Sequence, residues 1–163
     1  MLESKFLKDN IETIQKLMAL PPLRNFETKS LRQLLKMSKI REYAHGELII
    51  REGDIDPWLY FLLSGKVRVR KQGVDLFILD NIGDIFGEMR LLDGLDRSAS
   101  VYAEGKTVCL AVQTSATERL EVEEEKANFL VTLYRMFSEF VTMRLRLTNE
   151  ELVRVKKELD HLS

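Results

Sequence analysis

Cysteine and histidine are scarce in this chain, and their scarcity excludes several kinds of site. The 163 residues include one cysteine, Cys109, and two histidines, His45 and His161, which lie far apart in the sequence. One cysteine cannot form an internal disulfide, and this set is too small for a structural zinc site. Two histidines so placed give no catalytic triad, and no paired carboxylates stand out. We therefore predict no metal, no cofactor and no enzymatic activity.

Long apolar runs and an excess of one charge are also absent. No stretch approaches 18 uninterrupted apolar residues, and the first five residues lead into no apolar signal core, so we expect a cytoplasmic protein without a membrane segment. The 25 Lys and Arg residues nearly balance the 26 Asp and Glu residues, for a net charge of −1. This balance argues against a broadly basic nucleic-acid binder and gives no general attraction to DNA.

Glycine is missing from both flanks of the chain. All eight glycines lie between Gly46 and Gly105, so the first 45 and the last 58 residues contain none. Glycine marks turns and costs about 1 kcal/mol inside a helix, so the pattern predicts a strand-rich middle between helical flanks. We expect N-terminal helices over residues 1–44, a β domain over 45–115 and a C-terminal helix over 116–163.

The middle of the chain alternates short apolar segments with turn signals. The segments that predict strands are Leu48–Ile50, Trp58–Leu63, Lys66–Arg70, Leu76–Leu79, Ser100–Ala103 and Val108–Val112. The turn signals between them are Gly53-Asp54, Ser64-Gly65, Gln72-Gly73, Asn81–Asp84 and Glu104-Gly105. Short strands with regular turns favour a β sandwich or roll over βαβ units.

Both flanks show helical periodicity. In the first, Phe6, Ile11, Ile14, Leu17 and Met18 form an apolar stripe that Pro21-Pro22 ends. A second helix is predicted from about Lys29 to Ile40, with Thr28 as its N-cap. The last helix should begin near Thr117, with an acidic cluster at Glu121–Glu125 in its first turns. Its core-facing stripe is Phe129, Leu133, Met136, Phe137 and Phe140.

A second apolar stripe follows on the C-terminal helix. It has heptad spacing, with Leu145, Leu152 and Leu159 at one position and Val141, Thr148, Val155 and Leu162 at the other. Such a seam of about three heptads predicts a coiled-coil homodimer, in which Glu151 of one chain could pair with Lys156 of a parallel partner. The alternative is that this stripe completes the core of the monomer.

The glycine spacing is irregular at Gly83 and Gly87, which are too close to enclose a full strand. The segment that follows reads Phe86-Gly87-Glu88-Met89-Arg90-Leu91-Leu92, and Arg97-Ser98-Ala99 comes after a short loop. Free amides at a helix start, a forked guanidinium and a hydroxyl suit a phosphate. Because a phosphate repels the Glu88 carboxylate, that carboxylate must accept a hydrogen bond from another donor, such as a sugar hydroxyl. This combination predicts a nucleotide held by its sugar-phosphate end.

The same segment resembles the phosphate-binding cassette of cyclic nucleotide-binding domains, which occur in bacterial catabolite activator-type regulators, cyclic-nucleotide-dependent kinases and cyclic-nucleotide-gated channels. Two further segments, Gly46–Asp54 and Tyr60–Val67, resemble the opening strand and the next hairpin of that family. The resemblance implies an α+β, mainly β fold. Its centre would be a jelly-roll, or double-stranded β-helix, of about eight short antiparallel strands.

The resemblance also implies roles for individual residues. Glu88 would hold the ribose 2′-hydroxyl of cyclic AMP (cAMP) or cyclic GMP (cGMP). Arg97 would hold the cyclic phosphate, assisted by Ser98 and by the amides of Met89 and Arg90, with Gly87 and Ala99 beside them. The base would meet the C-terminal helix at Thr142 or, as second choices, at Thr148 and Asn149.

One departure and several alternatives remain open at this point. The family usually has Ala or Gly at the position of Arg90, whose side chain could crowd the phosphate, lie in solvent or add a cation. A structural ion pair between Glu88 and Arg97 is the alternative to ligand binding.

The functional hypothesis is a sensor that relays nucleotide occupancy through its C-terminal helix to an unidentified downstream protein. The second hypothesis is a dimeric interaction protein with a non-binding pocket. Direct DNA contact is not expected, because no helix-turn-helix follows the seam.

Overall fold

The computed structural model describes residues 1–5, 15, 17–24, 26–89, 94–115 and 123–163. The elements in chain order are β1 (Leu2–Glu3), η1 (Pro21–Leu23), α2 (Thr28–Lys36), β2 (Ser38–Tyr43), β3 (Leu48–Ile50), β4 (Trp58–Lys71), β5 (Val74–Leu79), β6 (Ile85–Phe86), β7 (Ser100–Gln113) and α4 (Glu123–Leu162). The predicted helical residues Phe6, Ile11 and Ile14, and the predicted helix start from Thr117 to Val122, lie outside the described residues.

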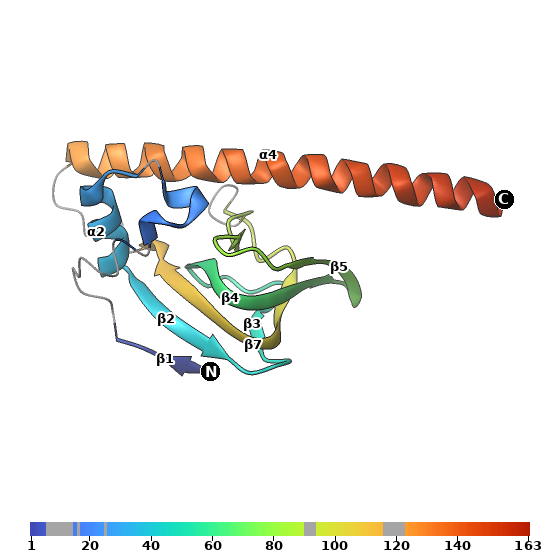
Figure 1. The fold of residues 1–163 in the computed structure, drawn as a ribbon, viewed down its shortest axis with the longest axis horizontal. Coiled ribbons are helices and arrows are strands. Elements are labelled where there is room, and N and C mark those ends of the chain that lie inside the picture. The colour runs from blue at the N-terminus through green and yellow to red at the C-terminus, as the bar shows by residue number, and fades with distance from the viewer. Residues whose placement is uncertain (6–14, 16, 25, 90–93, 116–122) are drawn as a thin grey trace.

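Among the described residues, seven strands form one antiparallel sheet that curls into a roll. Its main path is β1-β2-β7-β4-β5, while β3 pairs with β7 and β6 pairs with β4. Helix α4 runs along one side of this roll and continues past it (Figure 1). The mainly β, antiparallel roll with a long C-terminal helix confirms the predicted fold class.

The sheet contains fewer and longer strands than the sequence predicted. Strands β4 and β7 have 14 residues each, and each joins two segments that were predicted as separate strands. Gly65 and Gly105 therefore lie inside strands instead of in hairpin turns. The pairing of β4 with β7 shifts register on both sides of Ser64, and the second shift spans Gly65, so the glycine lies at an irregularity that lets the strand continue.

The first flank contains strands as well as helices, which corrects the prediction of helices alone over residues 1–44. Helix α2 ends at Lys36, four residues before the predicted end at Ile40, and its N-cap is Glu27 instead of Thr28. Strand β2 then pairs with β7 from Ser38 to Tyr43. The tertiary pairing with β7 outweighs the helical periodicity that had extended the prediction to Ile40.

The core has two parts that meet along the sheet. One part lies between the roll and the helices, and it includes all five residues of the predicted stripe on α4: Phe129, Leu133, Met136, Phe137 and Phe140. The other part fills the roll itself and contains Tyr60, Leu62, Val67, Ala103 and Cys109. Burial raises the pKa of the Cys109 thiol to about 12, as expected for an inert core residue.

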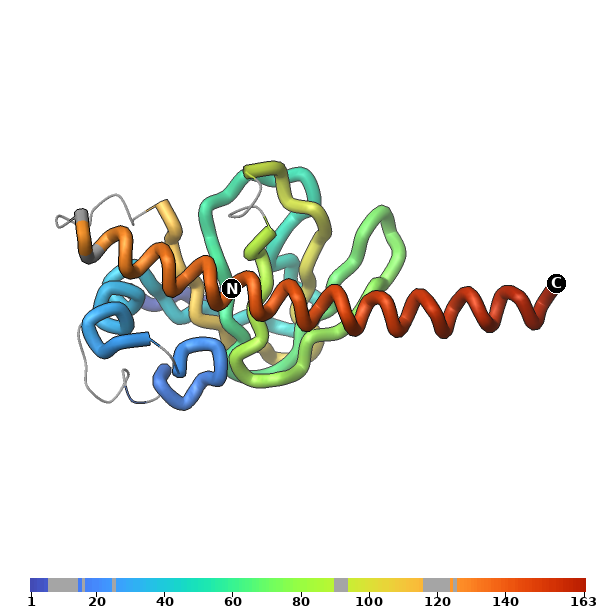
Figure 2. Tube along the Cα trace, turned by 90° about the horizontal axis from the view of Figure 1, so that it is seen from above, coloured from blue at the N-terminus to red at the C-terminus, as the bar shows by residue number. Residues whose placement is uncertain are grey.

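Helix α4 has 40 residues, which corresponds to about 60 Å. Its first half packs on the roll, and its second half projects away from it (Figure 2). From Leu145 onward every residue of the helix is exposed, including all of the predicted seam except the half-buried Val141. None of the described helices has a stretch apolar enough to cross a membrane. The described residues also contain no His, Cys, Asp and Glu group suited to a metal ion.

Candidate ligand-binding site

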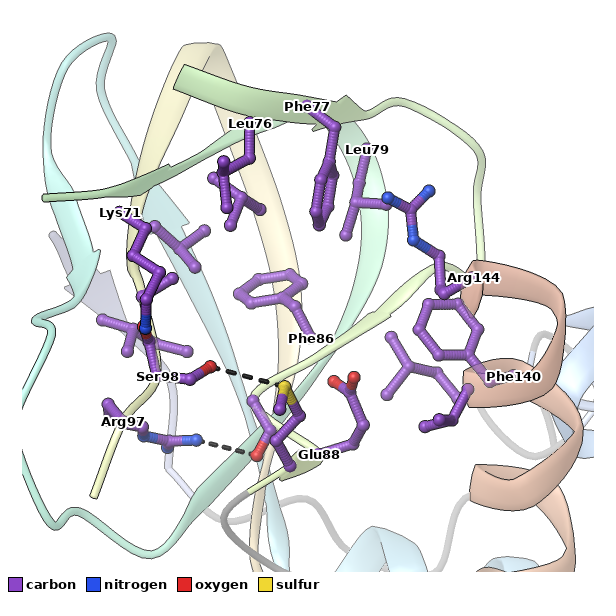
Figure 3. A pocket seen from close by; sticks show the side chains of 18 of the residues that line it. Lys71, Leu76, Phe77, Leu79, Phe86, Glu88, Arg97, Ser98, Phe140 and Arg144 are labelled. Carbon is purple, nitrogen blue, oxygen red and sulfur yellow. Dashed lines mark hydrogen bonds between the residues drawn. The ribbon is translucent and has the colours of Figure 1, made fainter. Parts of the chain in front are cut away.

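A cavity of about 440 Å³ lies between the roll and helix α4. This volume falls within the range of small-molecule sites. Its lining comes from the strands β3 to β7, the segments after β6 and before β7, and the middle of α4. Figure 3 shows labelled side chains from β4, β5, β6, these two segments and α4 around the same space. Apolar side chains make up most of the wall. The polar side chains that line it belong to Lys71, Glu88, Arg97, Ser98, Arg144 and Thr148.

Six of the eight predicted site residues line this cavity: Gly87, Glu88, Met89, Arg97, Ser98 and Ala99. Arg90 lies outside the described residues. The structure therefore brings together residues from both ends of the segment Phe86–Ala99, as the sequence predicted. Their contacts with a nucleotide stay predictions.

Thr142 does not line the cavity, which corrects its predicted placement. Its hydroxyl donates to the Ser138 carbonyl oxygen at 2.7 Å, and the residue lies at a separate, shallow hollow of α4. Thr148, a second choice from the sequence, does line the cavity, whereas Asn149 does not. The helical period explains the difference. Thr148 follows the buried Phe140 by eight residues and shares its side of the helix, while Thr142 is rotated from Phe140 by about 200°.

Arg97 is buried, and the protein itself occupies most of its hydrogen-bonding capacity. Its Nε donates to Asp56 Oδ2 at 3.1 Å, and its Nη2 donates to Asp56 Oδ1 at 2.5 Å. Nη1 donates to the Gly87 carbonyl oxygen at 2.7 Å, and Nη2 also donates to the carbonyl oxygen of Trp58. These contacts use four of the five N–H donors of the guanidinium. The ion pair of Arg97 is thus with Asp56, and the Glu88–Arg97 pair weighed as an alternative is not formed.

Gly87 makes this position of Arg97 possible. Its φ is +84°, and a Cβ at this residue would lie 2.6 Å from Arg97 Nη1 and 3.2 Å from the Trp58 carbonyl oxygen. Any side chain would therefore have to displace the guanidinium. The irregular glycine spacing in the sequence drew attention to Gly87. The structure shows why glycine is needed there, since a side chain would collide with the Arg97 guanidinium.

Asp56 is a residue of the site region that sequence reasoning missed. Burial alone would raise the pKa of its carboxyl, but the hydrogen bonds and charge of Arg97 outweigh burial and hold the pKa below its ordinary value. Asp56 Oδ1 also accepts from the Trp58 amide at 3.1 Å. This Asx-type turn before a strand is a local signal that could have identified the residue, although not its partner.

Glu88 presents the opposite electrostatic situation. Its carboxylate points into the cavity (Figure 3), and burial raises its pKa above the ordinary value despite the charges of Arg144 and Arg97. Within the described part of the chain, no cation forms an ion pair with it. A buried carboxylate without a paired cation suits a neutral donor, such as a hydroxyl group, that enters with a ligand.

Two further polar groups lie at the Arg97 end of the cavity. Lys71 Nζ donates to the Ser98 carbonyl oxygen at 2.7 Å, and the Ser98 hydroxyl contacts Met89 Sδ at 3.4 Å. A thioether is a weak acceptor, so the Ser98 hydroxyl can exchange it for a stronger one. Arg97, Lys71 and Ser98 together make this the end of the cavity that suits an anion.

The opposite end is formed by β5 and α4. The pairing of β5 with β4 shifts register between Val69 and Arg70, which leaves Leu76 unpaired. This bulge allows the consecutive residues Leu76 and Phe77 both to line the cavity. Across from them, the Arg144 guanidinium lies 3.8 Å from the centre of the Phe77 ring. Arg144 is the second residue that sequence reasoning missed, because nothing local distinguishes it from the other arginines of the helix.

The family model described as "Cyclic nucleotide-binding domain" matches residues 40–122. The chain belongs to this family. The match covers the whole cavity wall except the part contributed by α4, and it confirms the resemblance found in the sequence.

Individual relatives in the family agree with this assignment. The chain is 36% identical, over 74% of its length, to the cAMP-dependent protein kinase type II regulatory subunit of Drosophila melanogaster, and the match covers 33% of that protein. It is 37% identical, over 50% of its length, to the cGMP-dependent protein kinase of Toxoplasma gondii, of which 8% is covered. The chain thus spans a third or less of these relatives.

A solved structure supports the same fold. The catabolite activator protein of Thermus thermophilus superposes with a TM-score of 0.63 at 29% identity, covering 83% of this chain and 63% of that one. The cyclic nucleotide-binding family is therefore shown by sequence and by structure together.

Proposed function

We propose that this chain is a non-catalytic receptor module for a cyclic nucleotide. The observation that carries the proposal is the cavity itself, in which an anion-binding end and an unpaired, buried carboxylate lie beside an apolar end. A cyclic nucleotide offers a phosphate, a ribose hydroxyl and a flat base in the same order. The relatives named above include a regulatory subunit of a cAMP-dependent protein kinase and a cGMP-dependent protein kinase, which supports this ligand class.

In this proposal each part of the nucleotide meets a matching group. The cyclic phosphate takes the remaining N–H donor of Arg97, the Ser98 hydroxyl and the ammonium of Lys71. The ribose 2′-hydroxyl donates to Glu88, which thereby gains a partner for its buried carboxylate. The base lies against the apolar side chains of β5 and α4. Binding then replaces the weak contact of the Ser98 hydroxyl with Met89 Sδ by charge-assisted hydrogen bonds to the phosphate.

Calorimetric titration with cAMP and cGMP tests the proposal. We expect saturable binding to the wild-type chain and a stabilisation of about 2.7 kcal/mol when the nucleotide is at 100 times its dissociation constant. Glu88→Ala and Arg97→Ala should each remove most of the binding. Arg146→Ala, an exposed change on α4, serves as the matched control and should retain it. If neither nucleotide binds at millimolar concentration, the chain instead fits the alternative of an interaction protein with a non-binding pocket.

We also propose that the chain forms a parallel homodimer through α4. The apolar seam predicted from Val141 to Leu162 continues upstream with the same spacing, through Ala127, Val131, Tyr134 and Ser138, all of which are exposed. Three seam residues, Val141, Leu145 and Thr148, also line the cavity, but apart from the half-buried Val141 every seam position is exposed in the monomer. A heptad seam that is exposed over most of the helix supports a second copy of the chain as its partner.

The interchain pair suggested from the sequence is less favoured. Glu151 forms an ion pair with Arg154 on its own helix. It would have to leave or share this partner to reach Lys156 of a second chain. An exposed pair of this kind contributes little stability, so the apolar seam carries the argument for the dimer.

The remaining parts of the proposal concern output and location. Helix α4 lines the cavity and also carries the seam, so it can relay nucleotide occupancy to a downstream protein that binds the roll or the helix. We place this activity in the cytoplasm, where a free thiol such as Cys109 stays reduced. Direct contact with DNA forms no part of the proposal.

A further inference from the structure

The cavity has a direction that assigns a place to each part of a nucleotide. Figure 3 shows Arg97, Ser98 and Lys71 at one end, Glu88 in the middle, and Phe77, Phe140 and Arg144 at the other end. If the proposed function is correct, the phosphate and ribose occupy the first two places, so the base lies at the Phe77 and Arg144 end. The polar groups at that end then decide which base fits.

Arg144 is the cation whose donors are available there. Arg97 spends four donors on the protein, and Lys71 donates to Ser98. In the described part of the chain, the Arg144 guanidinium has no hydrogen-bond acceptor and no ion pair, and its contact is with the face of the Phe77 ring at 3.8 Å. The N–H donors of a guanidinium point outward in its own plane, so a ring contact leaves them free.

The other side chains at this end offer little to an amino group. Leu76, Leu79, Phe140 and Leu145 are apolar, and Thr148 contributes one hydroxyl. Adenine presents an acceptor, N7, next to an amino donor, N6. Guanine presents two acceptors, N7 and O6, which match the two parallel donors of an arginine. The N6 amino group of adenine would instead face the cationic donors of Arg144.

We propose that Arg144 is a specificity-determining residue that reads guanine, so that this cavity prefers cGMP to cAMP. The inference rests on the proposed function and adds to it the identity of the base. A bidentate arginine–guanine pair corresponds to a preference of about 5- to 150-fold over the wrong base. We therefore expect the dissociation constant of the wild-type chain for cGMP to be at least about fivefold lower than that for cAMP.

The test is a set of calorimetric titrations of both nucleotides against four proteins. In Arg144→Ala the preference for cGMP should disappear, mainly through weaker cGMP binding. Arg144→Lys keeps the charge but lacks the fork, so it should also lose the preference while it retains more of the cGMP affinity than the alanine variant. Arg146→Ala, two residues along the same helix and away from the cavity, should keep the wild-type preference. Thermal unfolding of each variant shows that it is folded before titration.

The outcomes separate the inference from the function on which it rests. A wild-type chain that binds both nucleotides equally, or cAMP more tightly, overturns the role of Arg144 and leaves the receptor function standing. The same holds if Arg144→Ala keeps the full preference for cGMP. A wild-type chain that binds neither nucleotide overturns the receptor function itself, and the inference with it.

Discussion

Glu88 and Arg97 lie in the same cavity, but their charges have different surroundings. Arg97 is surrounded by acceptors and forms an ion pair with Asp56, so its charge is well compensated without any ligand. Glu88 has no paired cation among the described residues, and burial opposes its ionised form. Burial of an unpaired carboxylate lowers the stability of the fold, so its position is better explained by a role in ligand binding than by a role in stabilising the protein.

This difference predicts a pH-dependent effect of Glu88→Gln. The pKa of Glu88 is raised in the folded state, so between the unfolded value of about 4.3 and the folded value the folded chain binds more protons than the unfolded chain. The free energy of unfolding therefore falls as pH rises through that window, and the loss is complete above the folded pKa. We expect Glu88→Gln to be more stable than wild type at pH 7, with the difference shrinking toward pH 4.

Urea denaturation at pH 4, 5, 6 and 7 measures this difference. The same variant should bind nucleotide more weakly, since the amide cannot replace the carboxylate as an acceptor for the ribose hydroxyl. Lower stability of Glu88→Gln at pH 7 would instead show that the carboxylate supports the fold. Glu104→Gln, which removes a carboxylate that pairs with Arg68, is the control and should give no gain at pH 7.

For Arg97 we expect a structural and a binding effect that can be separated. Arg97→Ala leaves the Asp56 carboxylate and two carbonyl oxygens without their donor, at an expected cost of about 2 kcal/mol, since Asp56 is 33% exposed and water can partly replace Arg97. Asp56→Asn in the Arg97→Ala background should recover part of this loss. A double-mutant cycle by chemical denaturation measures the coupling, which we expect to be about 1 kcal/mol or more.

Nucleotide titration of the same variants then isolates the binding role. Asp56→Asn should still bind, because the guanidinium remains, whereas Arg97→Ala and the double variant should not. Equal nucleotide affinity of wild type and the double variant would mean that Arg97 serves only the fold.

The residues that sequence reasoning found and missed differ in a physical way. Gly87, Glu88, Arg97 and Ser98 could be predicted because they belong to one short segment whose spacing reflects the chemistry of a nucleotide. Asp56 could not, since its partner Arg97 is 41 residues away and only the fold brings the two together. The family resemblance implies a base contact on the C-terminal helix and predicts Thr142 for it, but the position of the helix on the roll decides which side chain faces the cavity.

At the scale of elements, the two long strands β4 and β7 hold the roll together. They pair along nearly their whole length, and the pairing passes the irregularity at Gly65. Here φ is +85°, and a Cβ would lie 2.3 Å from the Lys106 carbonyl oxygen of β7. Backbone on the neighbouring strand therefore leaves no room for a side chain at this position.

Gly65→Ala should consequently destabilise the roll far more than an alanine at another left-handed glycine. Gly53 has a similar φ of +88° but no atom within 4 Å of its Cβ position. Gly53→Ala should cost about 1–2 kcal/mol, from backbone strain alone. Gly65→Ala adds the clash with β7 and should cost at least about 3 kcal/mol. Thermal and chemical denaturation measure the loss of unfolding free energy in each variant. Equal losses at Gly53 and Gly65 would contradict the clash with β7.

Local signals predicted the elements better than their boundaries. The Gln72-Gly73 turn between β4 and β5 was identified correctly, because two successive residues with positive φ make a tight hairpin. The same kind of signal at Ser64-Gly65 and Glu104-Gly105 was read as a turn, although each strand continues through it. Whether a glycine ends a strand or bends it depends on the partner strand, which is not visible in the local sequence.

At the scale of the whole molecule, α4 belongs to two surfaces at once. Val141, Leu145 and Thr148 line the cavity, and the same three residues are consecutive positions of the apolar seam. A ligand that contacts them and a second copy of the helix therefore act on one segment. If both bind, their free energies are coupled, and the coupling must be reciprocal.

Substitutions in the seam test the homodimer and this coupling together. Leu152 and Val153 have similar exposed fractions, 50% and 53%, but only Leu152 belongs to the seam. We expect Leu152→Glu to raise the dissociation constant of the dimer at least tenfold, about 1.4 kcal/mol, and Val153→Glu to leave it nearly unchanged. Sedimentation over a range of protein concentrations provides the measurement, and a wild-type chain that stays monomeric at micromolar concentration would contradict the dimer.

The coupling is tested by adding nucleotide to the same experiment. Saturating nucleotide should change the dimer dissociation constant of the wild-type chain, and Leu152→Glu should change nucleotide affinity, although Leu152 does not line the cavity. Linkage requires that nucleotide change the affinity of the dimer by the same factor by which dimerisation changes the affinity for nucleotide. Titration of nucleotide into dilute monomer and into concentrated dimer measures the second factor, which must agree with the first factor from sedimentation. Identical dimer dissociation constants with and without nucleotide would show that α4 holds the two chains together without relaying occupancy.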